Sequence, residues 1–325
     1  MSAVAAPAGR LRALELYCGI GGFAAALPEV EVALAVDQKE AALAVYRANH
    51  AGPARAANLE GLDLVRVVEE LGGDGRGPPE LWWLSPPCQP YTRRGRGRDL
   101  DDPRNRSFLR VVEAVARRRP RWLGLENVPE FQGSRAHALL RGALGDTPVE
   151  ERLLCPTELG VPMRRRRFYL VAGDGPLPLG REGAGPPPVT PSPELPAPAR
   201  RAPAGGAVGP GPGPRPLREV LGPPPASPRL LPGEVWSAYR HALHVLDPAD
   251  PGPTTCFTAA YGRSWVRSGS YLRAGEGARL LGAGEIARLL GFPPGFRVPD
   301  DAWDLVGNSL SVTAVRAVWS GFGRG

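Results

Sequence analysis

Short apolar runs alternate with helical patterns along the first 172 residues, and this alternation constrains the fold more than any other feature. The apolar runs cover residues 14–17, 32–36, 81–84, 122–125 and 168–172. The stretches between them place apolar residues at helical spacing, as in residues 41–46 and 108–116. Strands that alternate with helices are typical of a parallel sheet covered by helices. We therefore predict an α/β fold with a doubly wound sheet.

Glycine and proline, at 42 and 39 of the 325 residues, are unusually abundant and concentrate in one segment. Residues 176–214 contain Pro186-Pro187-Pro188 and few large apolar side chains, so they cannot bury enough surface to offset chain entropy. The sequence therefore predicts four regions. They are a catalytic and cofactor-binding core at 10–175, a flexible Pro/Gly-rich insert at 176–214, a small region at 215–253, and a C-terminal segment at 254–325 that returns to the core.

The cysteines indicate a reducing compartment. Cys18, Cys88, Cys155 and Cys256 are widely spaced and form no C-x-x-C pair, which argues against a zinc site or a disulfide scaffold. No apolar run approaches the roughly 20 residues that cross a bilayer. The first nine residues lack the charged and apolar regions of a signal peptide. We expect a cytoplasmic protein with no metal and no membrane partner.

The first motif with chemical meaning is the turn after the first predicted strand, Gly19-Ile20-Gly21-Gly22. Glycine lets the backbone turn tightly and approach a ligand, with helix N–H groups directed at it. Asp37 follows the second strand, where an acid can accept hydrogen bonds from ribose hydroxyls. The pair indicates a nucleotide-like cofactor, although a plain glycine turn with a capping aspartate has the same pattern.

Cys88 lies in the second motif, Ser85-Pro86-Pro87-Cys88-Gln89-Pro90, directly after the strand at 81–84. The two prolines fix the backbone at the carboxyl end of a strand, where open α/β sheets bind their ligands. Four arginines at positions 93, 94, 96 and 98 favour the thiolate form of a nearby cysteine. This context favours a reactive thiol, and a buried structural cysteine is the alternative.

Two further polar groups adjoin strands. Glu126 follows the strand at 122–125, where it can act as a general acid or orient a heterocycle; a capping or surface acid is the alternative. An arginine run precedes the strand at 168–172, and an extended backbone places Arg165 and Arg167 on the same side. A solvated basic turn is the alternative for that run.

In this order, the motifs resemble the cytosine-5 methyltransferase family, which uses S-adenosylmethionine. The matching blocks are the glycine loop with Tyr17, Asp37, Pro86-Pro87-Cys88-Gln89, Glu126-Asn127-Val128, Arg165-x-Arg167 and Gly307-Asn308-Ser309. The resemblance covers residues 11–172 and 254–322. It implies a Rossmann-like methyltransferase sheet, with a small target-recognition region at 215–253. Cys18 and Met163 depart from the family pattern, and Met163 stands where an amide side chain is usual.

Within this family the chain is most similar to the "DNA methyltransferase 2" branch, whose members methylate cytosine-38 in the anticodon loop of tRNA-Asp. Cys256-Phe257-Thr258, followed by Tyr261-Gly262, carries this similarity, together with residues 85–93 and 290–294. The resemblance implies a tRNA substrate in preference to DNA.

The resemblance also implies a role for each site residue. Cys88 is the nucleophile, Glu126 neutralises the cytosine ring at N3, and Arg165 and Arg167 position the base or Cys88. The implied cofactor-binding residues are Tyr17, Gly19, Ile20, Gly21, Gly22, Asp37, Gln38, Asn58, Leu59, Ser85, Asn308 and Ser309. The implied substrate-binding residues are Pro87, Thr92, Arg93, Cys256, Phe257 and Thr258. We expect S-adenosylmethionine as the cofactor, no metal ion, and a monomer.

The distribution of charge bears on the partner. The chain has a formal charge of +7, and Lys39 is its only lysine, so arginine carries almost all the positive charge. Arginine suits bidentate phosphate recognition, although a GC-rich genome also favours it. Residues 91–106 hold six arginines and three aspartates, whereas residues 176–253 hold seven arginines and six acids. The net positive charge is therefore concentrated directly after the Cys88 motif and not in residues 176–253. This distribution favours a nucleic acid that is recognised by its shape.

Two alternatives remain at this point. The same catalytic residues would serve a DNA cytosine-5 methyltransferase, alone or beside a restriction enzyme. A non-catalytic nucleic-acid-binding protein on a Rossmann scaffold is the other, and the presence of Cys88, Glu126 and Arg165 together argues against it.

Overall fold

The structure is a computed structural model, and it describes residues 10–92, 97–178, 215–249 and 252–322. The predicted insert at 176–214 lies almost wholly outside these described residues. The chain divides into two compact units. The first comprises residues 1–152, 168–183 and 322–325, and the second comprises residues 153–167 and 184–321. Residues 254–321 belong to the second unit in this division, and their predicted return to the catalytic core remains a prediction.

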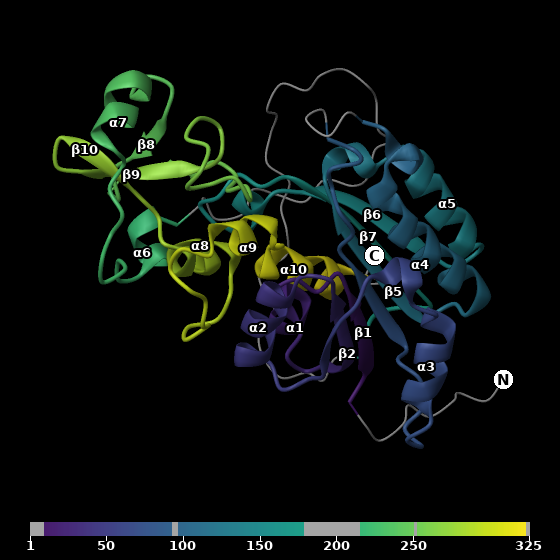
Figure 1. Cartoon of the computed structure of the whole chain (residues 1–325). Helices are drawn as coiled ribbons and strands as arrows, with labels where there is room; N and C mark the ends of the chain where they lie inside the picture. The colour runs from purple at the N-terminus through teal and green to yellow at the C-terminus, as the bar shows by residue number, and fades with distance from the viewer. Residues whose placement is uncertain (1–9, 93–96, 179–214, 250–251, 323–325) are drawn as a thin grey trace. The chain divides into compact units, whose positions relative to one another are not determined.

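A seven-stranded sheet in the order β3-β2-β1-β4-β5-β7-β6 forms the framework of the first unit (Figure 1). Its strands are β1 (Arg12–Leu16), β2 (Glu31–Asp37), β3 (Ala54–Ala56), β4 (Leu81–Leu84), β5 (Trp122–Asn127), β6 (Val149–Leu154) and β7 (Arg167–Gly173). The strands from β3 to β5 pair in parallel, and β7 runs antiparallel to β5. The predicted α/β class with a doubly wound sheet is confirmed.

The strand order reverses at β1, which lies between β2 and β4. The chain adds β2 and β3 on one side of β1 and then crosses to add β4 and β5 on the other. Ligands of open α/β sheets bind at such a switch point, outside the carboxyl ends of the strands. The loops that follow β1, β2, β4 and β5 therefore share the edge of the sheet at which a site is expected.

Helices follow the strands as the apolar spacing predicts. They are α1 (Gly22–Ala26), α2 (Glu40–Asn49), α3 (Leu64–Gly72), α4 (Arg106–Arg117) and α5 (Arg135–Leu144), with 3-10 turns η1 (Leu59–Gly61), η3 (Asp99–Asp101), η4 (Pro103–Asn105) and η5 (Pro129–Phe131). Helix α4 buries Phe108, Val111 and Val115 along one face, the spacing of an amphipathic helix. In the core, Trp83 of β4 is fully buried and stacks on Phe23 of α1, with ring centroids 5.3 Å apart.

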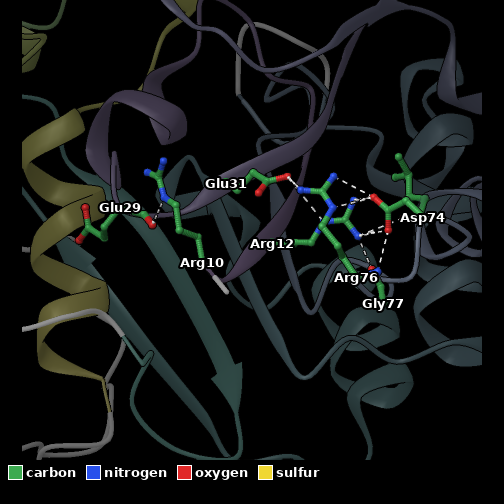
Figure 2. Close-up of polar contacts among 8 residues, drawn as sticks. Arg10, Arg12, Glu29, Glu31, Asp74, Arg76 and Gly77 are labelled. Atoms are coloured by element: carbon green, nitrogen blue, oxygen red, sulfur yellow. Dashed lines mark hydrogen bonds and ion pairs between the residues drawn. The ribbon is translucent and has the colours of Figure 1, made fainter. Parts of the chain in front are cut away.

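A network of ion pairs fastens the amino ends of β1 and β2, at the edge opposite the expected site (Figure 2). Arg12 is only 7% exposed and donates to Asp74 at 3.1 Å and to the carbonyl of Leu71 at 3.0 Å. Arg76 bridges Asp74 and Glu31, with nitrogen–oxygen distances of 2.8 and 2.7 Å. A buried guanidinium requires such partners, because burying it unpaired would be costly.

The second unit contains a three-stranded sheet in the order β10-β9-β8. Its strands are β8 (His244–Leu246), β9 (Ser270–Ala274) and β10 (Gly277–Leu280), and its helical elements are η6 (Pro156–Leu159), α6 (Leu217–Leu221), α7 (Gly233–Tyr239), α8 (Ala283–Leu290), α9 (Trp303–Asn308) and α10 (Val312–Gly321). Tyr261 organises its core. Its hydroxyl donates to the carbonyl of Ser270 at 2.7 Å and accepts the N–H of Leu281 at 3.0 Å.

Within the four described ranges, no helix is both long enough and apolar enough to cross a membrane.

Candidate active site

The glycine loop after β1 turns through left-handed backbone conformations. Tyr17, Gly19 and Gly21 have φ values of 57°, 53° and 88°. Such values suit glycine but are strained for tyrosine. The Tyr17 hydroxyl is held by a 3.1 Å hydrogen bond to Ser107 Oγ, at the start of α4. Ile20 is buried, and Gly22 begins α1.

The glycine loop has open space beside Gly19 and packs against His50 and Tyr46 at Gly21. A Cβ added to Gly19 would meet no atom within 4 Å, whereas one added to Gly21 would lie 2.3 Å from His50 Nε2. Gly21 therefore lets the backbone approach α2, and Gly19 leaves the outer side of the loop accessible. This asymmetry is what a backbone that cradles a ligand requires.

Asp37 ties the end of β2 to the glycine loop. One carboxylate oxygen accepts the N–H of Gly19 at 2.9 Å and the other accepts the N–H of Lys39 at 2.8 Å. Each carboxylate oxygen keeps a further lone pair, so Asp37 can still accept hydrogen bonds from a ligand. Sequence reasoning assigned Asp37 to a cofactor ribose, and the structure adds that it also orients the loop.

A buried carboxyl group lies behind the glycine loop. Glu15 of β1 is 1% exposed, and burial raises its pKa to about 8. The Tyr46 hydroxyl, at 3.3 Å, and the N–H groups of Phe23 and Ala24 lower the pKa in part. Glu15 is thus bonded to the first turn of α1, although the sequence pattern did not single it out.

Four other predicted cofactor residues lie on the loops that follow β2, β3 and β4. Gln38 is exposed, directly after Asp37. Asn58 begins η1, where its Oδ1 accepts the N–H of Glu60 at 3.0 Å, and the adjacent Leu59 is buried. Ser85 Oγ accepts the indole N–H of Trp83 at 2.9 Å.

Cys88 lies on the nucleophile loop, which we define as residues 85–98. Its side chain is half-buried, and its carbonyl accepts the N–H groups of Tyr91 and Thr92 at 3.1 and 3.3 Å. These bonds form a turn that holds the cysteine directly beyond the carboxyl end of β4. Pro87 is also half-buried, and Arg93 lies outside the described residues.

Glu126 is the second-last residue of the neighbouring strand β5, which continues two residues beyond the predicted end at Leu125. It is 9% exposed and lies in β5, whose Leu125 pairs with Leu84 at the end of β4. The next residue, Asn127, is 1% exposed and donates from Nδ2 to the carbonyl of Pro86 at 3.1 Å. Sequence reasoning noted Asn127 only as part of a motif, and the structure shows that it joins β5 to the nucleophile loop.

The second unit holds the predicted arginines. Arg165 is 4% exposed, and its guanidinium donates to the carbonyls of Phe257 at 3.2 Å and Gly307 at 3.4 Å, and to the carbonyl of Ser309. Arg165 therefore braces two distant segments of the chain, a role that the alternation pattern does not reveal. Its predicted role in positioning the base stays a prediction.

Arg165 and Arg167 also converge on Cys256. Their nitrogens lie 3.3 and 3.6 Å from Cys256 Sγ. Burial raises the pKa of this thiol, but the two guanidinium charges outweigh it, so the pKa is lowered overall. An electropositive setting of this kind favours a thiolate.

The remaining predicted residues of the second unit lie around the same segments. Phe257 is 1% exposed and packs edge-on against Tyr261, with ring centroids 5.0 Å apart. A Cβ on Gly307 would lie 2.3 Å from the backbone of Thr258, so the two segments touch only because residue 307 is glycine. Asn308 is exposed at the end of α9, and Ser309 is buried.

The first unit thus gathers one part of the predicted site at a single sheet edge. Tyr17 and the glycine loop follow β1, Asp37 ends β2, Cys88 follows β4, and Glu126 is the second-last residue of β5. In the second unit, Arg165 and Arg167 converge on Cys256, and Arg165 also donates to the carbonyls of Phe257 and Ser309. The arrangement in the first unit places a candidate thiol, a buried acid and a ligand-binding loop on adjacent strands.

The chain matches one known protein family. The family described as "C-5 cytosine-specific DNA methylase" matches residues 11–180, which include the glycine loop, Cys88, Glu126 and Arg165.

Among proteins of known function, the chain is similar to enzymes named tRNA (cytosine(38)-C(5))-methyltransferase. It is 39% identical to the Bos taurus enzyme over 177 residues, 52% of this chain and 44% of that protein. It is 36% identical to the Homo sapiens enzyme over 184 residues, 53% of this chain and 45% of that protein. The chain therefore matches about half or less of each relative's length. It is also 30% identical over 175 residues to a Dictyostelium discoideum protein named DNA (cytosine-5)-methyltransferase, 50% of this chain and 44% of that protein.

Solved structures show the same fold over nearly the whole chain. The Schizosaccharomyces pombe Dnmt2 methyltransferase has a TM-score of 0.73 and 24% identity, covering 96% of this chain and 98% of its own. The Entamoeba histolytica methyltransferase EhMeth has a TM-score of 0.76 and 19% identity, covering 95% and 97%.

Proposed function

Because the chain belongs to the family of C-5 cytosine-specific DNA methylases, we propose that it methylates carbon 5 of cytosine in nucleic acid, with S-adenosylmethionine as the methyl donor. One observation carries the proposal: Cys88 and Glu126 lie at the carboxyl ends of adjacent strands, β4 and β5, beside the glycine loop of β1. The chemistry requires a thiol and an acid near a cofactor loop.

The residues of the first unit fit this cofactor. Gly19 leaves open space beside the loop, and the carboxylate of Asp37 is oriented toward the same turn by its bond to the Gly19 N–H. Asp37 would accept hydrogen bonds from the ribose hydroxyls, and the half-buried Tyr17 and the loop of Asn58 would border the nucleoside. When bound, S-adenosylmethionine supplies an electrophilic methyl group.

Cytosine C5 is a weak nucleophile, and Cys88 would activate it. The Cys88 thiolate adds to C6, which makes C5 enamine-like and able to take the methyl group. A water molecule or a loop group then takes the C5 proton. The electrons of the C5–H bond form the C5–C6 double bond as the Cys88–C6 bond breaks, which frees the thiolate.

Glu126 would stabilise the adduct. Addition of a thiolate pushes negative charge into the ring, and a proton held on the Glu126 carboxyl can neutralise it at N3. Asn127 keeps the loop of Cys88 against the end of the strand that bears Glu126, so the two groups act on the same base. Arg165 and Arg167 keep their predicted role, in which they would position the base or Cys88 through charge-assisted hydrogen bonds.

We further propose that the substrate is tRNA, at cytosine-38 of the anticodon loop, as in the tRNA methyltransferases that the chain resembles. The base must leave its stack to reach Cys88, and this costs less in an unpaired loop than in a duplex. The Cys256-Phe257-Thr258 segment, braced by Arg165, supports the same assignment. Such an enzyme would act in the cytoplasm, and we expect a monomer.

The deciding experiment supplies labelled S-adenosylmethionine with either total tRNA or unmethylated genomic DNA. We expect label in tRNA, and bisulfite sequencing of the product should place it at cytosine-38. The variant Cys88→Ala should lose at least about a thousandfold in turnover, because the covalent route is removed. The matched control, Cys155→Ser, removes a thiol that the mechanism does not use and should retain activity.

Two outcomes would contradict the proposal. Label in DNA but not in tRNA would make the chain a DNA cytosine-5 methyltransferase, which is the activity named for the Dictyostelium relative. Full activity of Cys88→Ala would exclude the covalent mechanism.

A further inference from the structure

The nucleophile loop returns to its own beginning. The N–H of Asp99, directly after the loop, donates to the carbonyl of Pro90 at 3.0 Å. Residues 90 and 99 are therefore adjacent, and they form the two sides of a narrow stem. Cys88 lies directly before this stem, linked to it by the bond from the Tyr91 N–H to the Cys88 carbonyl.

Asn105 holds both sides of the stem with one side chain. It is fully buried, at 0% exposure. Its Oδ1 accepts the Tyr91 hydroxyl at 2.8 Å, and its Nδ2 donates to the carbonyl of Asp99 at 2.6 Å. The orientation of the amide is unambiguous, because a carbonyl can only accept a hydrogen bond.

Asp99 fastens the stem to a helix. Its carboxylate accepts the N–H groups of Arg135 at 2.6 Å and Ala136 at 3.3 Å, in the first turn of α5. The first N–H groups of a helix have no partner within it, and an acid there is also favoured by the helix dipole. Asp99 adopts a left-handed φ of 53°, a strained conformation that these contacts hold in place.

Tyr91 anchors the opposite side of the stem, next to Pro90, to the protein core. It is 6% exposed, and its ring packs edge-on against Phe131 of η5, with centroids 5.0 Å apart. The stem is thus anchored through Tyr91 to the core and through Asp99 to α5. The described structure supplies two fixed points for the loop that carries the nucleophile.

We propose that Asn105, together with Asp99 and Tyr91, forms a clamp that positions Cys88 for attack on the base. These three are positioning residues that act through the backbone of the nucleophile loop. The inference rests on the proposed function, because it assumes that Cys88 is the nucleophile.

Three variants test the hydrogen bonds of the clamp, and a fourth variant, Asp101→Asn, serves as the control. Asn105→Ala removes both bonds, Asn105→Asp keeps an acceptor for Tyr91 and loses the donor to Asp99, and Tyr91→Phe removes one hydroxyl and keeps the ring. Asp101→Asn alters an exposed acid of the same turn, whose carboxylate accepts a hydrogen bond from the Arg135 side chain at 2.7 Å.

The first readout is steady-state methylation of tRNA. We expect kcat to fall about tenfold in Asn105→Ala and about threefold in Tyr91→Phe, the scale of losing one or two buried hydrogen bonds. The KM for S-adenosylmethionine should stay within about twofold, because the glycine loop is untouched. Asn105→Asp should lose at least as much of kcat as Asn105→Ala, because it places a buried carboxylate against the carbonyl of Asp99. Asp101→Asn should match the wild type.

The second readout needs no activity. Trypsin cleaves after arginine, and residues 93, 94, 96 and 98 are arginines of the loop. Opening of the stem should raise the cleavage rate in this window about tenfold in Asn105→Ala, on the same energetic scale. Asp101→Asn should be cleaved at the wild-type rate.

The two readouts separate the possible failures. Wild-type rates of both cleavage and turnover in folded Asn105→Ala and Tyr91→Phe would overturn the clamp. An inactive wild type whose Asn105→Ala variant is cleaved faster would overturn the proposed function and support the clamp itself. If Asn105→Ala does not fold, Tyr91→Phe decides by the same measurements.

Discussion

Gly21 is a position at which a single methyl group should disturb the cofactor loop. Its φ of 88° is unfavourable for any side chain, and a Cβ would lie 2.3 Å from His50 Nε2 and 2.9 Å from the Tyr46 ring. We expect Gly21→Ala to lower the free energy of unfolding by about 1–3 kcal/mol. It should also weaken binding of S-adenosylhomocysteine at least about tenfold, measured by calorimetry.

Gly142 offers the matched control. It lies within α5, where an added Cβ would meet no atom within 4 Å. Gly142→Ala should raise the free energy of unfolding by about 0.5–1 kcal/mol, because alanine favours a helix. Equal effects of the two substitutions would show that the loop tolerates a side chain.

Glu15 should make the stability of the protein depend on pH. Burial raises its pKa from 4.5 to about 8. Between these values the folded protein holds a proton that the unfolded chain has released, so the free energy of unfolding falls as the pH rises. The contribution of Glu15 is greatest below pH 4.5 and is lost as the pH approaches about 8.

The variant Glu15→Gln tests this effect, because an amide does not titrate. Its stability relative to the wild type should increase with pH across that window, by at most about 1.4 kcal/mol per pH unit. Urea denaturation at several pH values measures the difference. Parallel pH profiles for the two proteins would contradict the prediction.

At the scale of elements, the ion-pair network at Arg12 should support the sheet without affecting the site (Figure 2). Arg12→Met leaves the carbonyls of Leu71 and Gly77 without this donor. Glu31 and Asp74 are more than one third exposed in their side chains, so water can replace part of what they lose. We expect the free energy of unfolding to fall by about 1–3 kcal/mol in urea denaturation, with kcat unchanged.

Arg76 provides the comparison within the same network. Its side chain is 56% exposed, and exposed ion pairs contribute little. Arg76→Met should therefore cost less than about 1 kcal/mol. A loss as large as that of Arg12→Met would mean that burial of Arg12 does not determine its contribution.

The elements with continuous apolar runs were predictable from sequence. Residues 81–84 form β4 with the predicted bounds, because four large apolar residues stand between Glu80 and Ser85. Strand β6 was not predicted. Its residues Glu150, Glu151 and Arg152 are charged and partly exposed at the end of the sheet, so they show no apolar run. Strands β9 and β10 of the second sheet also interrupt their apolar residues with Arg273 and Arg279, so they show no apolar run.

The candidate site was predictable where its residues follow strands. Polar and reactive residues at the carboxyl ends of strands indicate the edge of the sheet that binds ligands. Asp37, Cys88 and Glu126 lie at this edge. The clamp and brace residues were not predictable in this way. Arg165 contacts carbonyls 92 to 144 residues away in sequence, and Asn105 joins residues 91 and 99 through a fold that no spacing rule describes.

At the scale of the whole molecule, the two units are built from interleaved segments. Residues 153–167 belong to the second unit, although they lie between two segments of the first. The core at 10–175 stays a prediction, whereas the bonds from Arg165 to Cys256, Phe257, Gly307 and Ser309 have no signature in the order of the residues. Contiguity in sequence is a poor guide when a chain passes between units more than once.

The single lysine, Lys39, gives the chain one side chain that amine-reactive reagents can label. Lys39 is exposed, and its backbone N–H is bonded to Asp37 beside the glycine loop. Amine-reactive esters can therefore acylate one side chain in the entire protein, besides the terminal amine. A fluorophore attached in this way would sit two residues from Asp37 and could report cofactor binding by its emission. A protease that cuts after lysine would likewise open the chain once, between β2 and α2.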